Sequence, residues 1–308
     1  MSFSSHVKEE LCRIRVKAPA QRLLELSGLT LTCGALRIAK GLGVVYSSES
    51  LAVGKRILAL AGTLYEPDAT IELSERERPR PPLTTVTLSG ASVEKLLLDT
   101  GALSLDDGVR TIVRQIPLKA ETDEDCARAF LRGAFLGSGS CANPRRGYHL
   151  EIVTTEKEFC ESLCACIRRF SLSARRMQRK ERHIAYLKGD DVTGFLALVG
   201  ANHAALEIEN VRTEREFRNY VNRRSNCETA NIGKTVDAGL AQLRAIEAIE
   251  QATCLENLPE PLYEAARLRM QHPDATLQEL ADMAEIGKSG MNHRLTRLLR
   301  LAEEIQHD

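Results

Sequence analysis

The sequence predicts an α+β protein in which a duplicated mixed domain precedes an all-helical C-terminal module. Three observations support this prediction: an internal repeat within residues 22–201, the same order of strand-like and helix-like segments in both copies, and a wholly helical pattern beyond Ala201. The chain has 308 residues, of which 43% are hydrophobic and 27% charged, so it is long enough for two domains and too apolar for full disorder.

The repeat is clearest where Leu88–Ala102 aligns with Leu187–Ala201 without a gap. LSGASVEKLLLDTGA and LKGDDVTGFLALVGA share six of fifteen residues. A duplicated unit fixes the domain size, and it divides the mixed domain into halves of roughly 1–105 and 106–202. Two more pairs of segments continue the match: VVYSSES at 44–50 with IVTTEKE at 152–158, and RLLELSGLTLTCGAL at 22–36 with AFLRGAFLGSGSC at 129–141.

Each half is expected to form a helix, two strands, a helix, two strands and a helix. In the second half, Tyr148–Thr154 and His183–Lys188 alternate as half-buried strands do. Between them, five apolar residues from Phe159 to Phe170 recur at the spacing of one buried helix face. In the first half, Glu75–Leu83 carries three prolines among charges, so it is expected to be an exposed loop between strands.

The first apolar helix of each half contains internal glycines, which cost about 0.5–1 kcal/mol each relative to alanine unless something requires a close approach. These segments, LSGLTLTCG at 26–34 and LRGAFLGSG at 131–139, resemble degenerate copies of the LAGLIDADG motif of homing endonucleases. In that family the two motif helices pack together, and an acid before the final glycine holds the metals that cut DNA. Cys33 and Ser138 occupy those positions here, and neither replaces a carboxylate as a magnesium ligand.

The resemblance implies that residues 1–202 form a homing-endonuclease-like αββαββα domain that has lost the nuclease chemistry. We expect no catalytic residues, metal or other cofactor, and therefore no enzyme. An alternative from another class is a metal-dependent, homing-type DNA endonuclease that uses acids outside the motif, such as Glu25 or Glu151. Cleavage of DNA that requires magnesium and is lost on chelation would support that alternative.

Residues 258–308 are predicted to be a helix-turn-helix domain. Pro261–Gln271 has helical spacing, and Thr276-Leu-Gln-Glu279 is a capping-box sequence that opens a second helix. Ile286-Gly287 is expected to form a turn, and Ser289 to cap the last helix. Three helices with a tight glycine turn between the last two are typical of a helix-turn-helix.

The predicted DNA-binding side chains lie at the start of the second and last helices. The segment from Gly287 to Arg300 carries four basic residues and no acid, although residues 259–308 as a whole hold six basic and nine acidic residues. Asn pairs with adenine, Arg with guanine, and Ser with phosphate. An ordinary three-helix cap with a basic face is the alternative. The predicted DNA-binding residues are Thr276, Lys288, Ser289, Asn292, His293, Arg294 and Arg297.

Residues 203–257 are predicted to be a helical linker whose Asn and Arg side chains serve inter-domain hydrogen bonds or phosphate contacts. The most basic run of the chain, from Arg168 to Arg182, is either a solvated face or a surface that grips a protein partner or RNA. The candidate auxiliary contacts to DNA or a partner are Arg175, Arg176, Arg179, Lys180 and Arg223.

Taken over nearly its whole length, the chain resembles the WhiA family of bacterial regulators. The resemblance implies a DNA-binding transcriptional regulator linked to sporulation or to cell division and chromosome segregation. Double-stranded promoter or operator DNA is then the main partner, and another transcription regulator or RNA polymerase is a candidate second partner. The strings that carry the resemblance are FLRGAFLGSGS at 130–140, NPRRGYHLEI at 143–152, NCETANIGKTVDA at 226–238, LPEPLYEAARLR at 258–269 and GKSGMNHRL at 287–295.

Composition and the N-terminal sequence indicate in which compartment of the cell the protein is found. The charged N-terminus and the lack of an eighteen-residue apolar run disfavour secretion and membrane insertion, so we expect a cytoplasmic, nucleoid-associated protein. Nine scattered cysteines are expected to be free thiols. Because 42 basic residues balance 42 acidic ones, any nucleic-acid binding must be local rather than the result of bulk charge.

Overall fold

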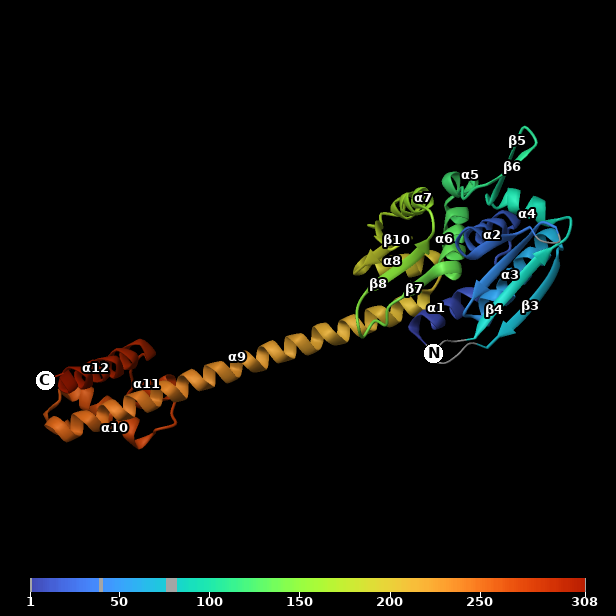
Figure 1. Cartoon of the computed structure of the whole chain (residues 1–308). Helices are drawn as coiled ribbons and strands as arrows, with labels where there is room; N and C mark the ends of the chain where they lie inside the picture. The colour runs from blue at the N-terminus through green and yellow to red at the C-terminus, as the bar shows by residue number, and fades with distance from the viewer. Residues whose placement is uncertain (1, 39–40, 76–81, 308) are drawn as a thin grey trace. The chain divides into compact units, whose positions relative to one another are not determined.

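The computed structural model describes residues 2–38, 41–75 and 82–307, which form two compact units, Met1–Glu214 and Arg215–Asp308. After an N-terminal helix α1 (Phe3–Cys12), the first half of the first unit forms the predicted helix, strand pair, helix, strand pair and helix (Figure 1). These elements are α2 (Pro19–Cys33), β1 (Gly34–Arg37), β2 (Gly43–Ser48), α3 (Leu51–Tyr65), β3 (Asp68–Ser74), β4 (Leu83–Ser89) and α4 (Val93–Asp99).

The second half repeats this order. A hairpin and a short helix that the repeat does not predict connect the halves: β5 (Leu103–Asp106), β6 (Val109–Ile112) and α5 (Leu118–Thr122). The repeated elements are α6 (Glu124–Ser138), β7 (Gly139–Cys141), β8 (His149–Thr154), α7 (Lys157–Arg168), β9 (Arg175–Arg179), β10 (Arg182–Lys188) and α8 (Asp190–Val199).

The two halves share one sheet topology, which confirms the predicted α+β fold with its internal duplication. The antiparallel strand orders are β1-β2-β4-β3 and β7-β8-β10-β9. The aligned segments of the repeat form equivalent parts of the halves, a strand followed by a helix that a left-handed glycine closes. Gly101 has φ +76° and Gly200 has φ +98°, so their identity in the repeat has a backbone cause.

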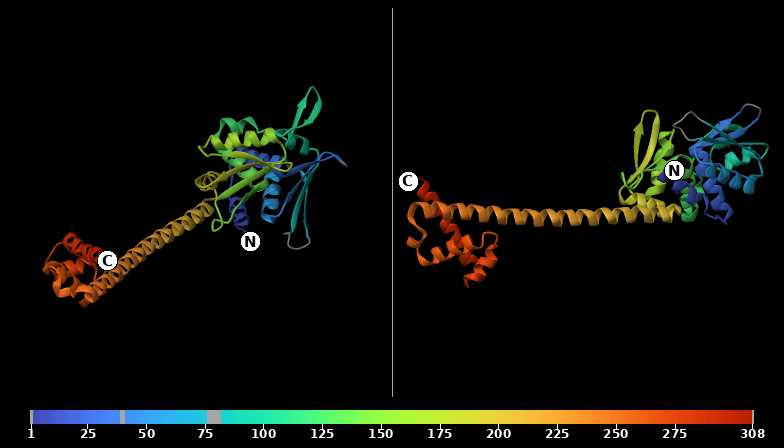
Figure 2. Two further views of the ribbon diagram at one scale, coloured as in Figure 1. Left: turned by 60° about the vertical axis from the view of Figure 1, so that its left-hand side comes forward. Right: turned by 90° about the horizontal axis from the view of Figure 1, so that it is seen from below.

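Helices α2 and α6 pack side by side between the two sheets (Figures 1 and 2). A Cβ atom on Gly28 would overlap the carbonyl oxygen of Phe130, and one on Gly133 would overlap the carbonyl oxygen of Glu25. The two backbones therefore touch where each helix lacks a side chain. This contact explains why Gly28 and Gly133 occur in the interior of helices, where glycine is otherwise unfavourable.

Alternation follows the predicted pattern along β8, and along β10 it is broken only at Ile184, which is buried like its neighbour Ala185. Leu150, Ile152 and Leu187 are buried under the helices, whereas Glu151 and Tyr186 lie on the other face, opposite each other in the β8–β10 register. The predicted loop at Glu75–Leu83 lies largely on residues 76–81, which are outside the described residues.

The second unit is entirely helical in the described residues. It contains most of the long helix α9 (Asn202–Thr253), then η1 (Leu255–Asn257), α10 (Glu260–Gln271), α11 (Leu277–Met283) and α12 (Lys288–His307). Its core joins Ile246 and Ile249 of α9 to Ala266, Leu280 and Leu295 of the last three helices. The end of α9 is thus part of the helix-turn-helix core as well as a connection to it.

The turn between α11 and α12 differs from the prediction in two details. Glu285, not Gly287, is the left-handed residue, with φ +54°. Ile286 N–H bonds to the carbonyl of Ala281 at 3.0 Å and Glu285 N–H to that of Asp282 at 3.2 Å, which is the Schellman pattern of a helix end. Ser289 lies in the first turn of α12 rather than at its cap, because Gly287 already accepts an intrahelical bond from Met291.

Candidate nucleic-acid interface

The start of α12 presents most of the predicted DNA-binding side chains to solvent. Lys288, Ser289, Asn292, His293 and Arg297 are all exposed, and on the opposite side of the helix Met291, Leu295 and Leu298 are buried in the core. The apolar residues recur every three or four positions, which fixes the rotation of the helix and leaves the polar residues outside. This is the arrangement of a recognition helix, whose first turns contact base edges.

Arg294 is placed differently from its neighbours on α12. It is half-buried, and its Nη1 donates to Oε2 of Glu264 on α10 at 2.8 Å. The ion pair ties α10 to α12 and occupies the guanidinium that sequence reasoning assigned to DNA. Arg294 therefore has a structural partner within the domain, whereas Arg297 forms no ion pair with any residue that the structure describes.

Thr276 caps α11 and is exposed. Its hydroxyl accepts from Glu279 N–H at 3.3 Å, while its own N–H donates to Glu279 Oε2 at 2.7 Å, which completes the predicted capping box. These hydrogen bonds, first the one from the Thr276 backbone N–H, lower the pKa of the Glu279 carboxyl. The cap sets where α11 begins, and with it the position of the Thr276 side chain.

A groove of about 530 Å³ brings Thr276, Lys288 and Asn292 together. It is lined by three cationic and several amide or hydroxyl side chains, and none of its described lining residues is acidic. Four of these residues come from α9, which sequence reasoning treated as a linker. The lining residues are Lys234, Thr235, Ala238, Gln242, Arg269, Thr276, Leu277, Gln278, Lys288 and Asn292.

Arg269 of α10 is buried and holds the base of the groove in place. Its Nε donates to Gln242 Oε1 of α9 at 3.0 Å, and its Nη1 donates to the carbonyl of Ala275 at 2.7 Å and to that of Pro273 at 3.2 Å. Burial of the guanidinium lowers the pKa of Arg269. One side chain thus joins α9, α10 and the segment that leads into α11.

The degenerate motif positions of the first unit are engaged in local bonds. The thiol of Cys33 donates to the carbonyl of Leu29 at 3.2 Å, and the hydroxyl of Ser138 donates to that of Val153 at 2.7 Å. Burial raises the pKa of the Cys33 thiol to about 12, so it is protonated at neutral pH. Neither side chain offers an anionic oxygen for a hard cation.

The two acids of the nuclease alternative are also occupied. Glu25 is fully buried, and its carboxylate accepts from Nε of Arg56 at 2.6 Å and from Nε of Arg132 at 2.9 Å. Glu151 accepts from Arg179 at 3.1 Å and lies 2.6 Å from the ring of His149. Two guanidinium groups already satisfy Glu25, which leaves it unsuited to bind a metal ion.

The basic run of the first unit divides between the two faces of its sheet. Arg175 lies opposite Tyr186 in the register and is exposed, as is Arg179. Arg176 points toward α7, where its Nε lies 3.3 Å from Oε1 of Glu161, and Lys180 forms the β9–β10 turn with φ +55°. Arg223 lies apart from this run, exposed on α9.

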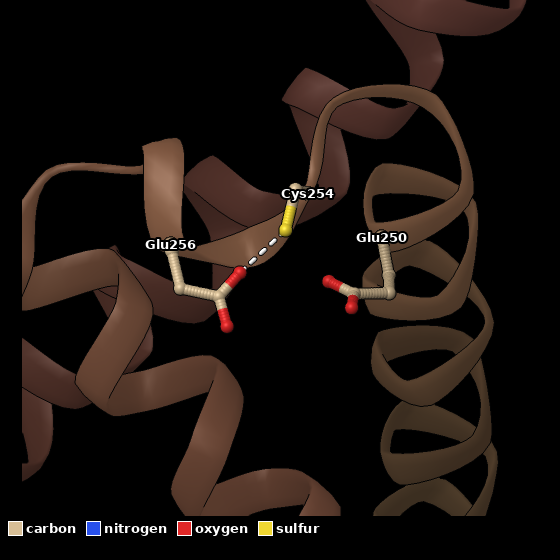
Figure 3. A group of neighbouring side chains, drawn as sticks. All are labelled: Glu250, Cys254 and Glu256. Carbon is tan, nitrogen blue, oxygen red and sulfur yellow. Dashed lines mark hydrogen bonds between the residues drawn. The ribbon is translucent and has the colours of Figure 1, made fainter.

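Among the described residues, one group of three side chains has the ligand types and spacing of a metal site. Figure 3 shows Glu250, Cys254 and Glu256, whose ligand atoms lie within 4.8 Å of one another. All three are exposed, Cys254 hydrogen-bonds Glu256, and Glu250 accepts from the N–H of Leu255 at 2.8 Å. These bonds close the turn after α9. All nine cysteines are free, as expected.

Comparisons with known proteins match both units. Residues 221–302 match the family model of the WhiA C-terminal HTH domain, and residues 127–218 match that of the WhiA LAGLIDADG-like domain. A "Probable cell division protein WhiA" from Alkaliphilus metalliredigens is 40% identical over 98% of each chain. Another from Clostridium novyi is 36% identical over 100% of this chain and 99% of its own.

The chain belongs to the WhiA family. Full-length DUF199/WhiA from Thermotoga maritima superposes with a TM-score of 0.64 at 28% identity and 99% coverage of each chain. A structure of the N-terminal LAGLIDADG domain of DUF199/WhiA gives a TM-score of 0.50 at 25% identity, over 65% of this chain and 92% of its own. The helix-turn-helix domain of WhiA indicates DNA binding. Among the described residues, no helix has the length and apolarity that a membrane span requires.

Proposed function

We propose that this WhiA-family protein is a sequence-specific transcriptional regulator of cell division, chromosome segregation or sporulation that reads DNA through the start of α12 and does not cleave it. The observation that carries the proposal is the exposed row of Lys288, Ser289, Asn292, His293 and Arg297 on a helix whose other face is anchored in the domain core. The protein is then associated with the nucleoid, and promoter or operator DNA is its partner.

Each exposed side chain has a role in this proposal. Asn292 pairs with adenine and Arg297 with guanine, because amide and guanidinium groups match the donors and acceptors of those bases in the major groove. Lys288, Ser289 and Thr276 contact phosphates, and His293 contacts the adjacent backbone. Arg294 acts as a positioning residue, since its ion pair with Glu264 fixes α12 against α10.

The first unit serves as a non-cleaving scaffold in this proposal. Cys33 and Ser138 stand where a nuclease would need carboxylates, and Glu25 is held by two arginines. Among its exposed basic residues, Arg175, Lys180 and the Glu151-paired Arg179 are candidate contacts to a second regulator or RNA polymerase.

A footprinting experiment tests the proposal. Wild-type protein and the variants Asn292→Ala and Asn202→Ala are titrated against genomic DNA fragments, with and without magnesium. Asn202 is an exposed asparagine of the first unit, outside the predicted interface, and provides the matched control. We expect discrete protected sites for wild type and Asn202→Ala, about 5- to 150-fold weaker protection for Asn292→Ala because one bidentate pair contributes ~1–3 kcal/mol, and intact DNA in every lane.

Two results would contradict the proposal. Uniform coating of the DNA that Asn292→Ala leaves unchanged would move the binding surface away from α12. Strand breaks that appear with magnesium and disappear on chelation would establish the nuclease alternative instead.

A further inference from the structure

We propose that α9 forms one wall of the DNA interface and that Lys234 of this helix binds a backbone phosphate of the site that α12 reads. The inference rests on the proposed function and extends it to a segment that the sequence presents as a linker. Lys234 lines the same groove as Lys288 and Asn292, so cations from two helices border one opening.

The face of α9 that lines the groove is set by helical spacing. Lys234, Thr235, Ala238 and Gln242 follow one another at positions i, i+1, i+4 and i+8, which places them along one side of the helix. Gly239 is buried beside them, and a Cβ on it would lie 3.6 Å from the carbonyl oxygen of Pro273. The α9 backbone therefore lies against the segment that enters α11.

Hydrogen bonds of Arg269 and a shared core hold this wall at a fixed distance from the recognition helix. Arg269 bonds Gln242 of α9 and the carbonyls of Pro273 and Ala275, while Ile246 and Ile249 of α9 share the core that also buries Met291 and Leu295 of α12. α9 and α12 are thus parts of one packed body. A phosphate contact through α9 needs no movement of the domain, which keeps its entropic cost low.

The chemistry of the groove fits the backbone of a nucleic acid. Lys234, Arg269 and Lys288 supply positive charge, and none of the described lining residues is a carboxylate. Lys234 is exposed, so its ammonium can approach a phosphate while it remains hydrated. Lysine on a flexible stem acts as a point charge toward phosphate and does not distinguish bases.

A salt series measures this contact separately from base reading. Affinity of the full-length protein for one footprinted site and for unrelated DNA is measured from 50 to 300 mM salt for wild type, Lys234→Gln and Lys234→Arg. We expect Lys234→Gln to reduce the slope of log K against log salt by about 0.9 and to lower affinity about eightfold at 0.1 M salt, equally on both DNAs. Lys234→Arg should keep the wild-type slope.

The matched control is Arg244→Gln, which removes one exposed cation from α9 outside the groove and should leave slope and affinity unchanged. If Lys234→Gln keeps the wild-type slope, or if Arg244→Gln reduces it equally, α9 is not part of the interface. The Asn292→Ala variant, read in the same series, separates this failure from that of the proposed function. If Lys234→Gln has no effect while Asn292→Ala no longer prefers the footprinted site over unrelated DNA, only the inference about α9 is overturned. If the wild-type protein itself does not prefer the footprinted site, both the inference and the proposed function are overturned.

Discussion

Single glycines show most directly how this sequence builds its first unit. Gly28 in α2 and Gly62 in α3 are both helix-interior glycines, but their surroundings are opposite. A Cβ on Gly28 would meet the backbone of Phe130 and Ala134, whereas a Cβ on Gly62 would meet no described atom within 4 Å beyond the adjacent backbone of its own helix. The first glycine is required by contact between two backbones, and the second only lowers the helix propensity.

Replacing each glycine with alanine should therefore change stability in opposite directions. We expect Gly28→Ala to lower the free energy of unfolding by about 1–3 kcal/mol or more, because backbone atoms cannot yield as a side chain can. Gly62→Ala should raise it by about 0.5–1 kcal/mol, since alanine costs less entropy in an open helix. Urea titration followed by circular dichroism measures both. Equal effects of the same sign would show that α2 and α6 do not touch at Gly28.

At the scale of elements, the short turn between α11 and α12 contains a strained residue. Glu285 occupies the left-handed conformation at φ +54°, which costs a side chain about 1–2 kcal/mol that glycine does not incur. Glycine relieves this strain, but its greater conformational entropy in the unfolded state offsets part of the gain. We therefore expect Glu285→Gly to raise the free energy of unfolding of the second unit by about 0.5–1 kcal/mol. Glu285→Ala, which keeps the Cβ, serves as the control in thermal unfolding. A gain from Ala equal to that from Gly would assign the effect to the lost charge instead.

The elements also show what sequence reasoning can and cannot reach. Repeats and apolar spacing predicted both αββαββα halves, because equivalent positions that pack in the same way carry similar residues at the same spacing. The β5–β6 hairpin was missed although Asp107 and Gly108, both at positive φ, form the Asp-Gly turn that signals a hairpin. The Glu264 partner of Arg294 could not be predicted, because a contact between residues thirty positions apart leaves no local pattern.

The α9 wall of the groove was missed for a related reason. Lys234 and Gln242 lie in a helix whose surface is mostly polar, and periodicity alone does not distinguish a solvated linker from one that borders a site. The buried Ala245, Ile246 and Ile249 at its end were the available signal that α9 enters the helix-turn-helix core. Nothing local in the sequence says which residues of another helix face them.

At the scale of the whole molecule, the residues that the structure describes form two hydrophobic cores with no residue in common. One joins α1 through the start of α9, and the other joins the end of α9 to α10, α11 and α12. Separate cores unfold as separate cooperative units when the segment between them contributes few buried contacts. Between Thr213 and Ala238 the described side chains of α9 are almost all exposed, so little buried surface couples the cores.

Calorimetry of the full chain should therefore resolve two unfolding transitions. Because enthalpy scales with residue number, Met1–Glu214 and Arg215–Asp308 should give enthalpies in a ratio of about two to one. Gly28→Ala should lower the midpoint temperature of the larger transition alone. Glu285→Gly should raise the midpoint temperature of the smaller transition alone, since variants without shared contacts act independently. A single transition that both variants shift would mean that α9 transmits folding from one core to the other. The base-reading variants of α12 would then need to be compared at matched stability before any loss of binding is assigned to DNA contacts.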